Sequence, residues 1–182
     1  MHALLIGTTG MLAAATKHVA CTATRVTLVA RHASTFSLGD PALDARLNPV
    51  EADWTDEQAL LRAVDQAAEA NGAFGLALVW LHPKAPDLRT RLASRMTAPP
   101  RRYIEVLGSA ASRPDAFGDR QLAAMGARED VRYSQVILGF VVDGDRSRWL
   151  TDAEIAAAAI RALESDAPRT VAGQVEPWDR KP

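Results

Sequence analysis

The opening stretch of the chain, residues 2–13, constrains the fold more than any other. Residues 2–6 are mostly apolar and lead directly into Gly7, and an alanine-rich segment follows Gly10. A short buried strand that turns sharply into a helix has this pattern. Gly7 can take a tight backbone conformation, and Gly10 lets the main chain come close to a pyrophosphate. A helix from about Thr9 to Thr22 would point its unpaired N–H groups at the same anion.

The spacing of this turn is Gly7-x-x-Gly10-x-x-Ala13, in which Ala13 takes the place of a third glycine. The position between the first strand and the first helix favours a dinucleotide site. The alternative is a purely structural turn, because two glycines at this spacing are common. We predict that a cofactor is contacted here by Gly7, Thr8, Thr9, Gly10, Met11 and Leu12.

The rest of the chain alternates between strand patterns and helix patterns. Amphipathic helices are predicted at about 55–71, 87–96 and 151–163, and residues 112–130 read as a loop with one helical segment. Thr55-Asp-Glu-Gln58 and Thr151-Asp-Ala-Glu154 match capping boxes at the start of the first and the last of these helices. This rhythm predicts an α/β protein with a three-layer Rossmann fold: a doubly wound parallel sheet of about seven strands with helices on both faces. The length suits one domain, residues 1–182. The strands after the first are expected at 25–31, 48–53, 75–81, 102–108, 133–142 and 169–175.

The end of the second predicted strand indicates which dinucleotide is bound. An acid at this place bonds the 2′-hydroxyl of NAD, whereas an arginine suits the 2′-phosphate of NADP. Arg31 stands there, and no Asp or Glu occurs between Gly10 and Asp40. His32 and Ser34 add hydrogen-bond donors. We therefore predict NADP(H) as the cofactor; the alternative is a surface arginine at a strand end.

Later strand ends supply further candidates, because ligands of open α/β sheets gather outside the carboxyl ends of the strands. Asp53 and Trp54 are placed beside the adenine, where Trp54 either stacks on the base or packs in the core. Leu81 and His82 end the central strand, and both are predicted at the cofactor.

Three residues are candidates for catalysis. Ser109 and His82 leave neighbouring strands and could orient and protonate a carbonyl or imine group, with Tyr133 as a further source of a phenol. The structural alternatives are a turn role for Ser109 and a hydrogen bond to a loop for His82.

Composition excludes several classes of function. Lys and Arg number 21 against 22 Asp and Glu, so no field attracts nucleic acid or an acidic membrane. The single cysteine, Cys21, excludes an internal disulfide and suits a reducing compartment. The four histidines lack the spacing of metal ligands. The segment after Met1 has neither a signal peptide nor a membrane span, so we expect a cytoplasmic protein with a small-molecule substrate. The apolar last helix and edge strand suit a homo-oligomer.

With these motifs in view, the chain resembles the short-chain dehydrogenase/reductase superfamily, in particular its small, atypical bacterial members. The resemblance is carried by Gly7-x-x-Gly10-x-x-Ala13, Arg31 and the pair Asp53-Trp54. It implies a seven-stranded sheet, NADP(H) across its carboxyl edge, and a catalytic serine at the end of the fifth strand, a position that Ser109 matches.

The chain departs from the family at the catalytic pair. In that family a tyrosine and a lysine lie four residues apart on one helix, and the lysine lowers the pKa of the tyrosine. Here the tyrosines are Tyr103 and Tyr133, and the residues four positions later are Leu107 and Ile137. We predict an NADP(H)-binding oxidoreductase that transfers hydride to or from a small carbonyl or imine substrate. The alternatives are a catalytically inactive NADP(H)-binding sensor or partner protein, and a structural domain that binds no nucleotide.

Overall fold

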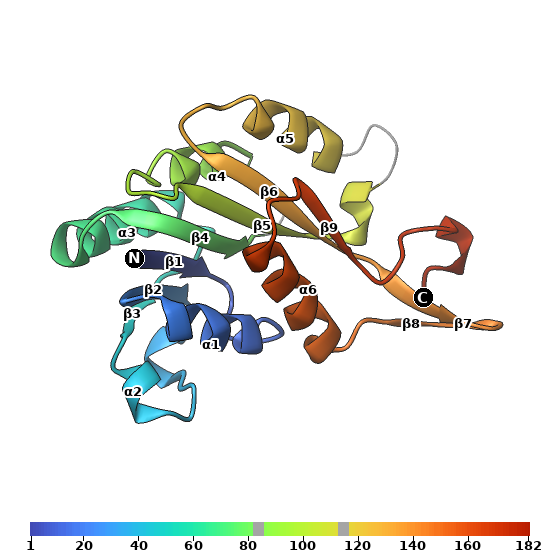
Figure 1. Cartoon of the computed structure of the whole chain (residues 1–182), viewed down its shortest axis with the longest axis horizontal. Helices are drawn as coiled ribbons and strands as arrows, with labels where there is room; N and C mark the ends of the chain where they lie inside the picture. The colour runs from blue at the N-terminus through green and yellow to red at the C-terminus, as the bar shows by residue number, and fades with distance from the viewer. Residues whose placement is uncertain (82–85, 113–116) are drawn as a thin grey trace.

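A computed structural model describes residues 1–81, 86–112 and 117–182. Within these residues seven parallel strands form one sheet in the order β3-β2-β1-β4-β5-β6-β9 (Figure 1). The order reverses beside β1, which makes the sheet doubly wound. The strands of the sheet are β1 (His2–Ile6), β2 (Arg25–Ala30), β3 (Leu47–Glu51), β4 (Phe74–Trp80), β5 (Arg102–Gly108), β6 (Arg132–Leu138) and β9 (Arg169–Ala172).

Helices cover both faces of the sheet, which confirms the predicted three-layer Rossmann fold (Figure 1). On one face lie α1 (Ala13–Thr22) and α6 (Asp152–Glu164), and on the other lie α3 (Glu57–Asn71), α4 (Pro86–Ala93) and α5 (Phe117–Gly126). Strand β1 shows why both faces are apolar. Leu5 packs in the core under α1 and α6, whereas Leu4 and Ile6 pack in the core under α3 and α4, because successive side chains of a strand point to opposite faces.

Helix α1 begins four residues later than the sequence predicts, at Ala13 instead of about Thr9. The hydroxyl of Thr16 donates to the carbonyl oxygen of Thr8 at 3.0 Å and to its hydroxyl oxygen at 2.9 Å, and both threonines are buried. Thr8 therefore points inward, and the chain completes a turn over residues 9–12 before helical hydrogen bonding starts.

The predicted cap of α3 is off by one residue, and that of α6 is confirmed. Asp56 accepts from the backbone N–H of Ala59 at 2.9 Å and is the N-cap of α3, whereas Thr55 is held by Asp53. Before α3 the short helix α2 (Pro41–Asp44) occupies part of the predicted connector. At α6, Thr151 and Glu154 form the expected capping box.

The prediction of a single strand over residues 133–142 is wrong, because strand pairing is interrupted at Gly139. A methyl group on Gly139 would lie 2.1 Å from the carbonyl oxygen of Gln174, so the backbones approach too closely for any side chain. β6 ends at Leu138, and an antiparallel hairpin of β7 (Phe140–Asp143) and β8 (Arg146–Trp149) projects from the body beside the C-terminus (Figure 1).

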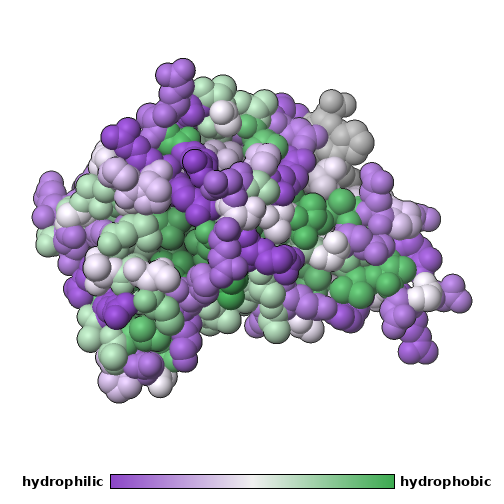
Figure 2. All heavy atoms as spheres, in the orientation of Figure 1, coloured by the Kyte–Doolittle hydropathy of each residue, from purple (hydrophilic) through white to green (hydrophobic). Residues whose placement is uncertain are grey.

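The face of the molecule seen in Figure 2 carries many polar residues, with apolar residues gathered in places, among them around the hairpin. In the ranges that the structure describes, no helix combines the length and apolarity needed to span a bilayer. The same ranges contain no group of three or more His, Cys, Asp or Glu side chains arranged to hold a metal ion.

Candidate dinucleotide site

A cavity of about 310 Å³ lies at the carboxyl ends of β1, β2 and β4, and we call it the Arg31 pocket. The structure brings five predicted residues together in its wall, namely Gly7, Thr9, Arg31, His32 and Trp54. The described lining is completed by Ile6, Val29, Ala30, Ala52, Leu60 and Trp80. The pocket therefore lies next to the strand-order reversal, the place where open α/β sheets bind ligands.

The turn after β1 depends on glycine for a steric reason. Gly7 has a φ of +70°, and a methyl group there would lie 2.6 Å from the carbonyl oxygen of Trp80. Its N–H donates to the carbonyl of Val29 at 3.0 Å. Gly10 differs, because a methyl group on it would meet no atom within 4 Å. Gly7 is needed to seat the turn against β4, while Gly10 leaves the backbone open to approach.

The turn leaves backbone donors free. Among the described residues, the N–H groups of residues 8–12 meet no hydrogen-bond acceptor, and α1 has no side-chain cap. Consecutive unbonded N–H groups before a helix attract anions. The side chains of Thr8 and Leu12 are buried, so these two residues can meet a ligand only through the main chain. Met11 is half-buried and packs against the core.

Arg31 is exposed at the end of β2 and makes no hydrogen bond or ion pair with any residue that the structure describes. His32 is exposed beside it. A guanidinium on the wall of a cavity is able to bind an anion there, because its five N–H donors match phosphate oxygens. The geometry thus agrees with the placement of Arg31 that the sequence predicts.

Ser34 and Asp53 do not line the pocket. The Ser34 hydroxyl donates to a carboxylate oxygen of Glu51 in a short hydrogen bond. Asp53 accepts the backbone N–H and the hydroxyl of Thr55 at 2.9 and 2.8 Å, and these hydrogen bonds lower the pKa of Asp53. Both side chains are thus engaged by neighbours. Glu51 was not predicted, since its contact with Ser34 depends on how β3 pairs with β2.

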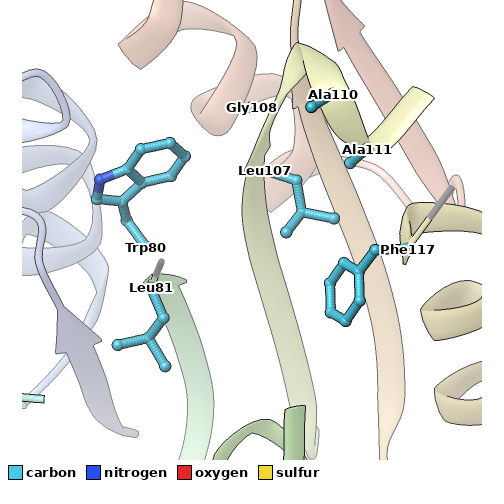
Figure 3. A pocket seen from close by; sticks show the side chains of 7 residues that line it. All are labelled: Trp80, Leu81, Leu107, Gly108, Ala110, Ala111 and Phe117. Atoms are coloured by element: carbon cyan, nitrogen blue, oxygen red, sulfur yellow. The ribbon is translucent and has the colours of Figure 1, made fainter. Parts of the chain in front are cut away.

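A second cavity, of about 220 Å³, adjoins the first, and we call it the apolar pocket (Figure 3). Trp80 lines both cavities. Leu81 lines this pocket and not the Arg31 pocket, and His82 lies outside the described residues. Trp80 is not among the predicted site residues, although a bulky aromatic residue at the carboxyl end of an apolar strand is a usable signal. The described lining consists of Trp80, Leu81, Leu107, Gly108, Ala110, Ala111 and Phe117.

Ser109 is buried at the carboxyl end of β5, in the 3-10 turn of residues Ser109–Ser112. It lines a third cavity, of about 280 Å³, together with Gly108, Trp149 and Leu150. Gly108 also lines the apolar pocket, so the two cavities meet at the end of β5. The predicted position of Ser109 at the carboxyl edge agrees with the structure.

Tyr133 lies elsewhere than the prediction requires, near the beginning of β6, and its side chain is buried. Its hydroxyl donates to Glu105 at 2.6 Å and accepts from Gln135 at 3.1 Å. Burial and the Glu105 carboxylate raise the pKa of Tyr133. A phenol that already donates to a buried carboxylate, at the wrong end of its strand, cannot deliver a proton at the carboxyl edge. The prediction of Tyr133 as a catalytic residue is therefore wrong.

Comparison with known proteins shows where this fold occurs. No known family profile and no curated protein matches the sequence. Among solved structures, the alcohol dehydrogenase of the archaeon Thermococcus sibiricus, complexed with 5-hydroxy-NADP, superposes with a TM-score of 0.67 at 13% identity, over 93% of this chain and 94% of that chain.

Two further structures agree. A short-chain dehydrogenase from Streptomyces avermitilis has a TM-score of 0.64 at 15% identity, over 94% of this chain and 88% of that chain. A variant of a Serratia marcescens short-chain dehydrogenase/reductase has a TM-score of 0.60 at 17% identity, over 94% of this chain and 96% of that chain. At these identities the likeness concerns the fold. The chain has the fold of the short-chain dehydrogenase/reductase superfamily.

Proposed function

We propose that the chain binds NADP(H) and is an oxidoreductase that transfers hydride to or from a small carbonyl or imine substrate. One observation carries this proposal: Thr9, from the turn with unbonded backbone N–H groups, lines one cavity on the carboxyl edge together with Arg31 and Trp54.

The chemistry of these groups fits the parts of the dinucleotide. The N–H groups of residues 8–12 suit the diphosphate, and the open space at Gly10 lets it approach the main chain. Trp54 offers an aromatic surface for the adenine. Arg31 suits the 2′-phosphate, which NADP carries and NAD lacks.

The solved neighbours support a nicotinamide dinucleotide in general. The Thermococcus sibiricus enzyme was solved with 5-hydroxy-NADP, and another neighbour, at 18% identity, is an NADH-dependent reductase complexed with NAD. Neighbours of this kind do not distinguish the two cofactors. The choice of NADP(H) for this chain rests on Arg31.

The bound nicotinamide supplies or accepts the hydride, and the residues of this chain position the reactants. The turn after β1 binds the diphosphate, and Trp80 forms part of the wall of both the Arg31 pocket and the apolar pocket. We assign Ser109 to hold the substrate oxygen or nitrogen through its hydroxyl, and His82 to exchange the proton. The two residues follow adjacent strands, β5 and β4.

Cofactor preference tests the role of Arg31. We expect NADPH to bind at least about tenfold more tightly than NADH, because a hydrogen bond to a charged group is worth about 1.5–3 kcal/mol. Arg31→Ala should remove most of this difference. Titration calorimetry measures both affinities, with Arg62→Ala as the control, since Arg62 is exposed on α3 and does not line the pocket. Equal affinities in the unmodified protein would refute the assignment of Arg31.

A second function is favoured by one observation, the absence of the tyrosine and lysine pair. Helix α5, which joins β5 to β6, contains neither residue, and Tyr133 is used inside the protein. A chain built this way suits an NADP(H)-binding sensor or an inactive partner. Oxidation of NADPH in the presence of aldehydes, ketones or imines, if lost in Ser109→Ala, supports the enzyme. Tight binding without turnover supports the sensor.

A further inference from the structure

The described walls of the apolar pocket suit an uncharged ligand. Every residue of its described lining is glycine or has a hydrophobic side chain, and the indole N–H of Trp80 is the one polar side-chain group among them. Among the residues that the structure describes, a charged group placed there would lose its hydration without gaining a partner of opposite charge. The volume of about 220 Å³ exceeds the roughly 150 Å³ of an apolar cavity known to hold benzene in another protein. The space therefore suits an uncharged group of about the size of an aromatic ring.

Small residues keep this space open. After β5 the chain enters a 3-10 turn, where Ala110 and Ala111 lie against the pocket (Figure 3). Helix α5 packs closely on that turn, since a methyl group on Gly118 would lie 2.2 Å from the carbonyl oxygen of Ala111. Larger residues at the two alanines would fill the cavity.

A buried ion pair supports the wall from beneath. Arg89 on α4 and Glu105 on β5 form a salt bridge in which both side chains are fully buried. The Arg89 guanidinium lies 4.9 Å from the centre of the Phe117 ring and donates to the carbonyl oxygen of Leu81 at 3.3 Å. Both contacted residues line the apolar pocket. The wall is thus held in place before any ligand arrives, which reduces the entropic cost of binding.

The position of the pocket connects it with the dinucleotide site. Trp80 lines both cavities, and the carbonyl oxygen of the same residue is the atom against which Gly7 packs. A ligand in the apolar pocket would therefore be a neighbour of a dinucleotide in the Arg31 pocket. Figure 3 shows Trp80 and Leu81 at the end of β4 across from Leu107 and Phe117.

We propose that the apolar pocket binds the uncharged, apolar end of the substrate, a group of about the size of a benzene ring. That this ligand is a substrate rests on the proposed function, whereas its chemical class rests on the pocket alone. Such a pocket favours aryl or compact alkyl carbonyl compounds over small keto acids and phosphorylated compounds.

The test uses benzyl alcohol and benzoate, which are similar in size and differ in charge. The full chain is titrated without dinucleotide, and the indole N–H signal of Trp80 is followed by NMR after assignment with Trp80→Phe. We expect benzyl alcohol to shift this signal with a dissociation constant of the order of 1 mM. Benzoate should bind at least about tenfold more weakly, because the described lining offers its carboxylate no cation. Equal binding of the two, or no shift with benzyl alcohol, overturns the inference.

A pair of matched variants tests the location. Ala110→Leu adds three carbons in the pocket at an exposed position and should weaken benzyl alcohol binding at least about tenfold. Ala124→Leu makes the same change at an exposed position of α5 outside the pocket and should leave it within twofold. Benzyl alcohol binding that is unaffected by Ala110→Leu overturns the inference. The comparison with benzoate needs no variant and stands even if one fails to fold.

NADPH titration of the same samples separates this inference from the proposed function. Benzyl alcohol binding as expected, with no binding of NADPH, supports the apolar pocket and refutes the proposed function. NADPH binding without discrimination between benzyl alcohol and benzoate supports the proposed cofactor and overturns the proposed ligand of the apolar pocket.

Discussion

At the scale of the residue, the two glycines of the first turn have different tasks. Gly7 is held at a positive φ against the end of β4, whereas Gly10 has open space where a side chain would stand. Glycine is required at position 7 by the protein's own backbone. In the proposed function, glycine is required at position 10 by the ligand. Substituting each glycine by alanine separates these two causes.

We expect Gly7→Ala to lower the free energy of unfolding by about 2 kcal/mol or more, because the left-handed conformation and the close carbonyl both oppose a methyl group. Gly10→Ala should change that free energy by less than about 0.5 kcal/mol and weaken NADPH binding about tenfold. Denaturant unfolding and calorimetry measure the two quantities. If Gly10→Ala binds NADPH as tightly as the unmodified chain, the diphosphate does not approach this backbone.

At the scale of the element, Glu154 joins the hairpin to the last helix. Its carboxylate accepts the N–H and the hydroxyl of Thr151 and two N–H groups of Arg148, at 2.8 to 3.0 Å. The hydrogen bond from Arg148, with those from Thr151, lowers the pKa of Glu154 from its ordinary 4.5 to about 2. One side chain therefore caps α6 and ties β8 to it.

This pKa predicts how stability depends on pH. Because the folded-state pKa is the lower one, ionised Glu154 stabilises the folded protein above pH 4.5, and the contribution is lost as the pH falls toward about 2. We expect Glu154→Gln to melt at a lower temperature than the unmodified chain at pH 7, and the difference to shrink to nothing between pH 4.5 and 2. Asp152→Asn, in the same helical turn, is the control. A difference independent of pH would contradict the assignment.

At the scale of the whole molecule, a chain of buried polar groups connects elements that are distant in sequence. Arg89 pairs with Glu105, which accepts from Tyr133, and Gln135 donates to Tyr133 and to the carbonyl of Gly118. Gln135 in turn accepts from Arg169. The network thus joins α4, β5, β6, α5 and β9, and it ends under the apolar pocket.

Breaking the network at the ion pair should destabilise the whole fold. Arg89→Met leaves Glu105 buried without its cation, which is expected to lower the free energy of unfolding by about 3–5 kcal/mol. The double variant Arg89→Met/Glu105→Leu should recover much of that loss, because no unpaired charge remains. Arg128→Met removes an ion pair with the exposed Asp130 and should cost at most about 1 kcal/mol. Denaturant unfolding measures all three. A double variant no more stable than Arg89→Met would show that the ion pair is not the cause.

Much of the fold could be predicted from the sequence, because strand and helix leave local patterns. The alternation of apolar strands with amphipathic helices predicted the parallel sheet and its two helical layers, and Thr151 and Glu154 predicted the start of α6. The carboxyl-edge positions of Gly7, Arg31 and Ser109 followed as well, because parallel strands end at one edge. The end of β6 before Gly139 was not predicted, since its cause is the carbonyl of Gln174, which is distant in sequence.

The sequence by itself determined which groups stand at the carboxyl edge of the sheet, because the order of elements places every strand end there. Only the tertiary structure decided which side chains face a cavity. It turned Thr8 inward to Thr16, engaged Ser34 with Glu51, and placed Tyr133 in a buried network with Glu105. These outcomes depend on pairing between distant segments, and no local pattern of residues encodes such contacts.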